Sequence, residues 1–260
     1  VYKRQLIHST PALTMTTRAF IMQQAYQSIR IVSEAQTIRV GLSSDPDELM
    51  LRELCTVCAS LSGGASEGIK AVVLDFSSTE NRRHKDAAKA WNRDVDKGAI
   101  NDAPTVVEQA YGAIRGVAQP VLGVVRDTLS PAACKLLSAA DFTLVAEDAR
   151  LIVTGKGEES QESQMSGANA ARLHYVTWSA AAGDISKEME RILNMLREKS
   201  AVALRFAKAS TRLGQSEQLT PLEAMQRINT LYLDELMRTQ DAAEGLRAFL
   251  EKRKPLWRNA

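Results

Sequence analysis

The sequence has little that would place the chain in a membrane, in a disulfide-stabilised class or on nucleic acid. No apolar run approaches the roughly 18 residues that a membrane-spanning helix needs, and no secretory signal pattern stands at the front. Only three cysteines occur in 260 residues, an odd number that argues against a disulfide framework and indicates a reducing environment. The net charge of +2 gives no electrostatic case for nucleic acid. We therefore expect a cytoplasmic protein that binds neither a membrane nor nucleic acid.

The residues that are present have the composition of a folded globular protein. Apolar residues make up 45% and charged residues 25% of the chain, and 260 residues can bury a large core, as one domain or one domain with an appendage. Residues 1–25 are treated as a separate N-terminal segment. Its first five residues, Val1–Gln5, resemble the translated end of a sequencing adapter, and we expect them to play no part in the fold.

Strand and helix patterns alternate through the first part of the chain. Two β-prone runs, 28–32 and 37–42, predict an antiparallel hairpin. A helix is predicted next, with Asp45 as N-cap, Pro46 at its first position and Glu48 at its third. Helical patterns then alternate with continuous apolar runs that are typical of buried strands. These runs are 71–76, 120–125 and 142–146. The order predicts parallel β-α-β units, and hence an α/β fold.

The pattern changes after the last of these strands. Residues 155–169 are polar and weakly periodic, which predicts a loop, and the segments from Ser186 onward are helical. Thr220–Glu223 has the spacing of a capping box. An apolar stripe follows it, made of Leu222, Met225, Ile228, Tyr232 and Leu236. We therefore divide the chain into an α/β core at 26–183 and a helical C-terminal region at 184–260.

The cysteines and histidines predict no metal centre. Cys55 and Cys58 have redox or zinc spacing, but with only Cys134 elsewhere a four-ligand zinc site would need histidines. Cys58 lies on an apolar helical stripe, so we interpret the pair as buried and structural. His84 and His174 are far apart and belong to no Ser-His-Asp pattern. The sequence also has no glycine-rich dinucleotide motif and no Walker motif.

The most distinctive segment is near the C-terminus. From Asp241 it reads D-A-A-E-G-L-R-A-F-L-E-K-R-K-P. Asp241 precedes Glu244 by three residues, which predicts a capping box and a helix start. The cationic turn Lys252–Lys254, followed by Pro255, suits a helix end. The segment as a whole resembles the C-terminal signature of the enoyl-CoA hydratase/isomerase (crotonase) family.

Four further segments extend this resemblance over residues 26–258, in the order of the family. Residues 71–74 resemble the strand before its first oxyanion loop, and 119–125 resemble its K-P-V-I-A-A-V strand. Residues 134–149 resemble C-E-L-A-L-A-C-D-x-x-x-A-x-x-x-A, and 200–208 resemble S-P-x-A-x-x-x-x-K. The resemblance implies a crotonase-like α/β fold of repeated ββα units with a helical C-terminal trimerisation region.

The resemblance also implies an oxyanion hole. The family holds the carbonyl of an acyl-CoA thioester between two backbone N–H donors, which stabilise the enolate-like charge that develops. The loop with the first donor corresponds to 82–86, where Arg83 stands without the usual glycine; the alternative there is a solvated basic stretch. The second donor lies at a helix N-terminus, where Ala132 takes the place of the donating glycine.

The acid and base groups of the family are not at their expected places. Hydration in this family commonly uses two glutamates. The first corresponds to Lys135 and the second to a position near Gly155, so the pair is absent. Isomerase or hydrolase chemistry needs only one base, for which Asp86, Asp127, Glu158 and Glu159 are the candidates. For Glu158, a polar loop is the alternative interpretation.

The C-terminal helix keeps the family's CoA contacts. Phe249 and Lys252 match the phenylalanine and lysine with which one subunit packs against, and pairs with, the adenine nucleotide bound by its neighbour. The alternative is that Phe249 belongs to the core and that Lys252 is a cation suited to the helix dipole. The resemblance implies acyl-CoA as ligand and a homo-oligomer, either a trimer or a hexamer, with no cofactor and no metal.

Three functions remain open at this point. The first is an enoyl-CoA hydratase/isomerase-family enzyme, a lyase or isomerase of fatty acid or aromatic acid metabolism that acts through an oxyanion-stabilised enolate. The second is a non-catalytic CoA-binding protein, a pseudoenzyme or the partner of an active paralogous subunit, which the missing glutamates favour. The third is an interaction protein with no ligand, against which Phe249 and Lys252 argue.

Overall fold

The computed structural model describes residues 26–62, 68–77, 104–154 and 162–259, and its centre is a six-stranded sheet in the order β1-β2-β3-β4-β5-β8. β1 and β2 are antiparallel, and every later pair of neighbours is parallel. β6 and β7 form a separate antiparallel pair. The strands are β1 (Arg30–Glu34), β2 (Thr37–Ser43), β3 (Ala71–Ser77), β4 (Val121–Val125), β5 (Phe142–Ala146), β6 (Arg150–Thr154), β7 (Glu162–Ser166) and β8 (Trp178–Ala180). The predicted α/β class is confirmed.

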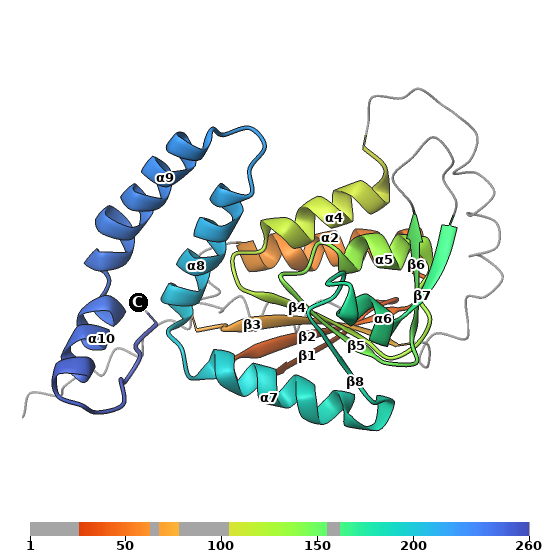
Figure 1. Ribbon diagram of the computed structural model, residues 1–260, viewed down its shortest axis with the longest axis horizontal. Coiled ribbons are helices and arrows are strands. Elements are labelled where there is room, and N and C mark those ends of the chain that lie inside the picture. Colours follow the sequence, from red (N-terminus) through yellow and green to blue (C-terminus); the bar gives the residue numbers. More distant parts are fainter. Residues whose placement is uncertain (1–25, 63–67, 78–103, 155–161, 260) are drawn as a thin grey trace, which may run out of the picture.

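Helices cover both faces of the six-stranded sheet (Figure 1). α2, α4 and α5 lie on one face and α7 lies on the other, while α8, α9 and α10 extend beside the sheet. The helices are α2 (Glu48–Ser62), α4 (Val106–Gly116), α5 (Pro131–Leu137), α6 (Gly167–Arg172), α7 (Ile185–Arg197), α8 (Ala201–Gly214), α9 (Pro221–Thr230) and α10 (Gln240–Leu250). Short helical turns lie at Ala182–Asp184, Leu231–Glu235 and Leu236–Arg238. In the described ranges, no helix is long and apolar enough to cross a membrane.

The predicted hairpin is present, but its turn is tighter than expected. β1 runs to Glu34 and β2 begins at Thr37, so only Ala35 and Gln36 connect them. Both have positive φ, 44° and 62°, as a two-residue type I′ turn requires. The main-chain N–H of Lys70, just before β3, donates to the Gln36 carbonyl at 2.8 Å. The turn is thereby tied to the start of the next strand.

α2 confirms the predicted apolar stripe but not the predicted cap. The stripe is buried along its length, at Met50, Leu54, Val57, Cys58 and Leu61. The N-cap, however, is Asp47, whose Oδ1 accepts from the Met50 N–H at 2.8 Å. The helix therefore begins at Glu48, and Pro46 lies before it. The assignment of Asp45 as the cap was wrong because either aspartate satisfies the local pattern.

The predicted loop at 155–169 is wrong over its described part. Residues 162–166 form β7, which pairs with β6, and Gly167 starts α6. A Cβ on Gly167 would lie 2.0 Å from the Ala146 carbonyl oxygen, so only glycine lets α6 approach β5 this closely. The polar pattern did not indicate a strand because the pairing partner, not an apolar face, holds β7 in place.

The C-terminal helices leave much of the predicted apolar stripe on the surface. Leu222, Met225 and Tyr232 are 69%, 59% and 51% exposed, and the buried residue of α9 is Ala224. Exposed apolar side chains continue on α10, at Leu246, Phe249 and Leu250. The helical period was predicted correctly, but this face does not pack on the chain's own core. Contiguous apolar surface of this kind is typical of interaction sites.

Candidate functional site

The carboxyl ends of β2, β3 and β4 meet at one edge of the sheet, where ligands of open α/β folds usually bind. We call this the carboxyl-edge site. β2 ends at Ser43 and β3 at Ser77, and these two residues help to line a cavity of about 160 Å³. α5 begins at the same edge, and the Ser130 N–H donates to the Ser44 carbonyl at 2.9 Å. The start of α5 is therefore fixed against the end of β2.

The first turn of α5 presents a free backbone donor to this edge. Ser130 is the N-cap, and its Oγ accepts from the Ala133 N–H at 3.3 Å. Pro131 takes the first helical position and has no N–H. Within the described part of the chain, the N–H of Ala132 has no hydrogen-bond acceptor. This N–H lies at the positive end of the helix, where it could donate to an anionic oxygen, and the role of Ala132 as an oxyanion donor stays a prediction.

The other candidates for the chemistry lie outside the described residues. This applies to Arg83, Asp86 and Glu158, so their predicted roles remain predictions. Of the candidates that are described, Asp127 is exposed at the end of β4.

Lys135, which stands where the family has its first glutamate, belongs to a surface ion pair. Its Nζ lies 3.4 Å from Glu108 Oε1, and both side chains are about half exposed. The pKa of Glu108 is lowered, first by the Thr105 N–H, then by the Thr105 hydroxyl and by Lys135. A lysine held by a carboxylate cannot replace a glutamate as a base in this position. The glutamate that the resemblance implies at this position is therefore not replaced by another carboxylate or free base.

A charged group at this edge was not predicted from the sequence. Asp75, within β3, is largely buried between two arginines: Arg126 Nε lies 3.4 Å from its Oδ1 and Arg39 Nε 3.9 Å from its Oδ2. Arg126 also donates from Nη1 to Ser186 Oγ at 3.3 Å, which links the end of β4 to α7. The signal was a lone carboxylate in an otherwise apolar strand, since buried aspartates are normally paired.

Phe249 is on the surface, so the interpretation of this residue as core is wrong. Its side chain is 81% exposed. Lys252 follows the end of α10 with φ of 52°, where its N–H donates to the Phe249 carbonyl and the Arg253 N–H donates to Ala248. This is a Schellman motif with lysine in the left-handed position that usually holds glycine. The ring and the ammonium group are both available to a ligand or a neighbouring subunit.

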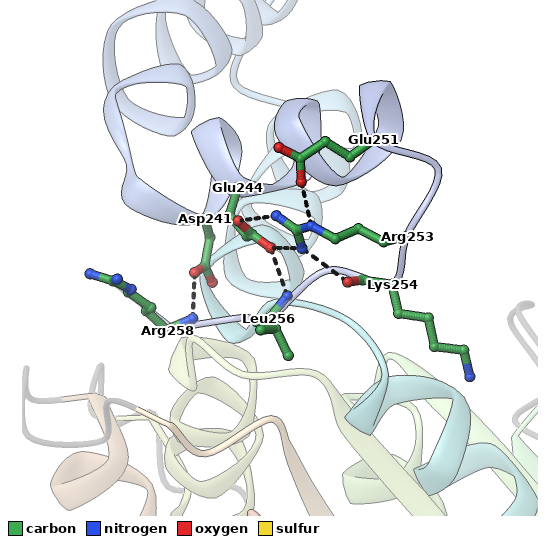
Figure 2. Close-up of polar contacts among 7 residues, drawn as sticks. All are labelled: Asp241, Glu244, Glu251, Arg253, Lys254, Leu256 and Arg258. Carbon is green, nitrogen blue, oxygen red and sulfur yellow. Dashed lines mark hydrogen bonds and ion pairs between the residues drawn. The ribbon is translucent and has the colours of Figure 1, made fainter.

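The chain beyond α10 folds back on the helix and is held by Glu244 (Figure 2). Arg253 donates to both carboxylate oxygens of Glu244, from Nη1 at 2.6 Å and from Nη2 at 3.1 Å, a two-pronged geometry that is among the strongest ion pairs. The Leu256 N–H donates to the same carboxylate at 2.9 Å. Trp257 Nε1 then reaches the Glu198 carbonyl at 2.7 Å. We call residues 253–259 the tail.

The predicted capping box of Asp241 and Glu244 is wrong. Thr239 caps α10 through the Ala242 N–H at 3.1 Å, and Asp241 lies inside the first turn. Its buried carboxylate instead accepts from the Ser200 hydroxyl and from the main-chain N–H groups of Arg258 and Asn259. The spacing matched a capping box, but both carboxylates of the signature hold the tail.

Docking of the tail is expected to depend on acid pH. The pKa of Glu244 is lowered from 4.5 to about 2, first by Arg253 and then by the Leu256 N–H. Because this pKa lies below that of the unfolded chain, the stabilisation is complete above pH 4.5 and is lost as the pH falls toward 2. We expect the tail to detach in that window, with a red shift of Trp257 fluorescence.

Two variants control this measurement. Trp257→Phe identifies the part of the emission that comes from the tail. Glu244→Gln, which has no carboxylate to protonate, should already have a loosened tail at pH 7 and no transition below pH 4.5. A Trp257 signal that is constant from pH 4.5 to 2 while the circular dichroism of the core is retained would contradict the role of Glu244.

Of the cysteine pair predicted to be buried, Cys58 is buried and Cys55 is partly exposed. Cys55, Cys58 and Cys134 form no disulfide, and no group of three metal-ligating side chains occurs in the described ranges. The pKa of Cys58 is raised to about 12, first by burial and then by the neighbouring Cys55. A thiol of this kind is inert at neutral pH.

One short sequence match to a characterised protein is found. No protein-family model matches the chain. Over 60 residues the chain is 43% identical to the cyclohexa-1,5-dienecarbonyl-CoA hydratase of Thauera aromatica. This stretch covers 23% of the chain and 22% of the length of that hydratase. The match is therefore local.

Solved structures match over most of the chain. An enoyl-CoA hydratase of Geobacillus kaustophilus is 14% identical with a TM-score of 0.72, over 91% of this chain and 98% of that one. The enoyl-CoA hydratase of Bacillus anthracis is 17% identical with a TM-score of 0.69, over 90% and 100%. An enoyl-CoA hydratase/isomerase of Mycobacterium paratuberculosis is 18% identical, also with a TM-score of 0.69, over 91% and 100%. The chain has the crotonase fold, as the resemblance predicted.

Proposed function

We propose that this chain is a divergent member of the enoyl-CoA hydratase/isomerase family and binds acyl-CoA thioesters at the carboxyl-edge site. The observation that carries the proposal is the free N–H of Ala132 at the start of α5, on a fold that matches enoyl-CoA hydratases over nine-tenths of the chain. An N–H at this place would donate a hydrogen bond to the thioester oxygen as enolate charge develops on it. Arg83 would supply the other N–H of the oxyanion hole. The site needs no metal and no cofactor beyond the CoA thioester.

The absence of the first glutamate favours a reaction other than hydration. Lys135 is paired with Glu108. An enzyme with a single base, Asp86 or Glu158, would abstract the proton next to the thioester carbonyl, as an isomerase does. The second candidate function, a CoA-binding subunit without turnover that acts beside an active paralogue, is favoured by the same ion pair. Three cysteines that form no disulfide suit a reducing, cytoplasmic compartment for either function.

Assembly into a homo-oligomer, a trimer or a hexamer, completes the proposed ligand site. The exposed apolar residues of α9 and α10 supply a surface that a second copy would cover. Phe249 lies on α10 and Lys252 just after its end, where they would contact the adenine nucleotide of a CoA bound by the neighbouring subunit. A protein that remains monomeric in multi-angle light scattering at micromolar concentration would contradict this arrangement.

Exchange of Phe249 and Lys252 for alanine is expected to weaken acyl-CoA binding at least tenfold, about 1.4 kcal/mol. The double variant removes the ring and the ammonium group but leaves the backbone of α10 unchanged. Calorimetric titration with a non-hydrolysable acyl-CoA measures the dissociation constant. The matched control is Lys254→Ala with Leu256→Ala, which removes a cation and an exposed apolar side chain from the same segment. Equal dissociation constants for both variants and the wild type would sink the assignment.

Proton exchange separates the two candidate functions. If the enolate forms, a saturated acyl-CoA incubated with the protein in D2O should acquire deuterium next to its carbonyl, whether or not a product is released. Mass spectrometry of the recovered thioester detects this exchange. Binding without exchange would favour the non-catalytic subunit. Exchange that persists in both Asp86→Asn and Glu158→Gln would exclude these two carboxylates as the base.

A further inference from the structure

A second cavity lies at the opposite edge of the sheet from the carboxyl-edge site. It has a volume of about 350 Å³ and lies between α8 and the amino ends of β4 and β5. We call it the amino-edge cavity. One part of its wall is apolar, made of Pro120, Ala140, Phe142, Leu196, Leu204 and Ala207. This volume falls within the range of about 300–1,000 Å³ that is usual for small-molecule sites.

The rest of the wall carries more positive than negative charge. Asp141 is the one carboxylate among the described residues that line the cavity, and three cations accompany it: Arg115, Lys208 and Arg212. Lys208 Nζ lies 2.7 Å from Asp141 Oδ2, and Arg212 Nη2 donates to Asp141 Oδ1 at 2.9 Å. Lys208 also donates to the Gln119 carbonyl at 2.8 Å. One carboxylate thus faces three cations, an excess of two positive charges.

Two of the cations have unused donors. Nε and Nη1 of Arg212 are buried without an acceptor in the part of the chain that the structure describes. Arg115 is half-buried, lies over the Tyr111 ring at 5.9 Å and has no ion-pair partner there. Buried guanidinium donors without an acceptor are costly. Burial lowers the pKa of Lys208, and the charge of Arg212 lowers it further, although Asp141 opposes both effects.

We propose that the amino-edge cavity binds a small organic phosphate ester. Its dianionic phosphate would neutralise the excess charge and accept from Arg115 and Arg212, because the guanidinium fork matches phosphate oxygens in pairs. Its organic part would rest on the apolar wall beside Leu196 and Leu204. A carboxylate would neutralise only half of the excess. The site is separate from the proposed CoA site, since it lies at the other end of the parallel strands.

The test uses phenyl phosphate, inorganic phosphate and benzoate as probes, titrated calorimetrically at constant ionic strength. We expect phenyl phosphate to bind more tightly than inorganic phosphate and benzoate to bind most weakly. Arg115→Gln should weaken the binding of phenyl phosphate about tenfold, the effect of a lost charge-assisted contact. Ala207 is exposed and lines the cavity. Ala207→Phe should therefore abolish binding, because the larger side chain would fill the cavity without changing its charge.

Arg205→Gln is the matched control. Arg205 lines a neighbouring cavity of about 480 Å³ but does not line the amino-edge cavity. Arg115 and Arg212 line both cavities. Its removal should leave phenyl phosphate binding unchanged. The proposal is overturned if the wild type binds none of the probes at 10 mM, if benzoate binds as well as phenyl phosphate, or if Arg205→Gln weakens binding as much as Arg115→Gln. Circular dichroism checks that each variant is folded.

Discussion

Replacing Asp141 with asparagine is expected to lower the free energy of unfolding by about 3–5 kcal/mol, the usual cost of breaking a buried ion pair from one side. The Lys208 side chain is 6% exposed, and its ammonium group would lose its counter-charge. Arg212 would lose the same partner. The Val121 N–H, which donates to Asp141 Oδ2 at 2.8 Å, would face an amide instead of a carboxylate. Both cations would then be stranded between α8 and the sheet.

Urea unfolding at pH 7 measures the effect. Asp148→Asn, an exposed aspartate, is the matched control and should change the stability by less than about 0.5 kcal/mol. Combining Asp141→Asn with Lys208→Met removes the stranded charge, so the double variant should be more stable than the sum of the single changes predicts. A loss below 1 kcal/mol for Asp141→Asn, or strict additivity, would show that the pair does not hold α8 to the sheet.

Much of the core could be predicted because its elements are specified by short stretches of sequence. β4 is buried at every residue and was visible as an unbroken apolar run. α2 was visible through an apolar stripe that the structure buries completely. The capping box of Thr220 and Glu223 is also local, and both of its hydrogen bonds are present. In each case the deciding interactions lie within the element or are those of a fully buried face.

Elements whose structure depends on distant partners could not be predicted in the same way. β7 is polar and exists because β6 pairs with it. Asp241 matched a local capping pattern, but its partners are Ser200, 41 residues away, and the tail. The apolar stripe that starts at Leu222 was predicted as one face of a helix, and the structure leaves much of that face exposed. A helical period reports which residues share a face; it does not report what covers that face.

The segments that carry the family resemblance supply contacts that hold the elements of this fold together. Asp141 and Lys208 come from two such segments, and they join α8 to the start of β5. Ser200 comes from the same segment as Lys208 and Asp241 from the C-terminal signature, and these two residues join α8 to α10. By contrast, Lys135 stands at a catalytic position of the family and forms a surface ion pair. The resemblance therefore rests on groups that stabilise the scaffold, which is why it predicts the fold more firmly than the reaction.

Asp241→Ala is expected to release the tail and to lower the stability by about 2–3 kcal/mol, the cost of leaving buried donors without an acceptor. The carboxylate is 3% exposed and accepts from the Arg258 N–H at 2.7 Å, the Asn259 N–H at 3.0 Å and the Ser200 hydroxyl. Ser200 caps α8 through the Ala203 N–H at 3.1 Å. Asn259 adds a second cap, because its Oδ1 accepts from the Ala201 N–H at 3.0 Å. Loss of Asp241 thus loosens the two side chains, Ser200 and Asn259, that cap the N-terminus of α8.

Limited trypsin digestion and Trp257 fluorescence follow the tail, and urea unfolding follows the whole chain. The wild type should resist cleavage after Arg253, whereas Asp241→Ala should be cut there and show red-shifted emission. Asp241→Asn keeps one side-chain oxygen for the two main-chain donors, so its loss should be about half as large. Asp234→Ala, an exposed aspartate paired with Arg238 at 3.4 Å, should cost less than about 1 kcal/mol and leave the tail docked. If Asp241→Ala keeps the tail protected, the buried carboxylate does not hold it, and Glu244 with Trp257 must be sufficient.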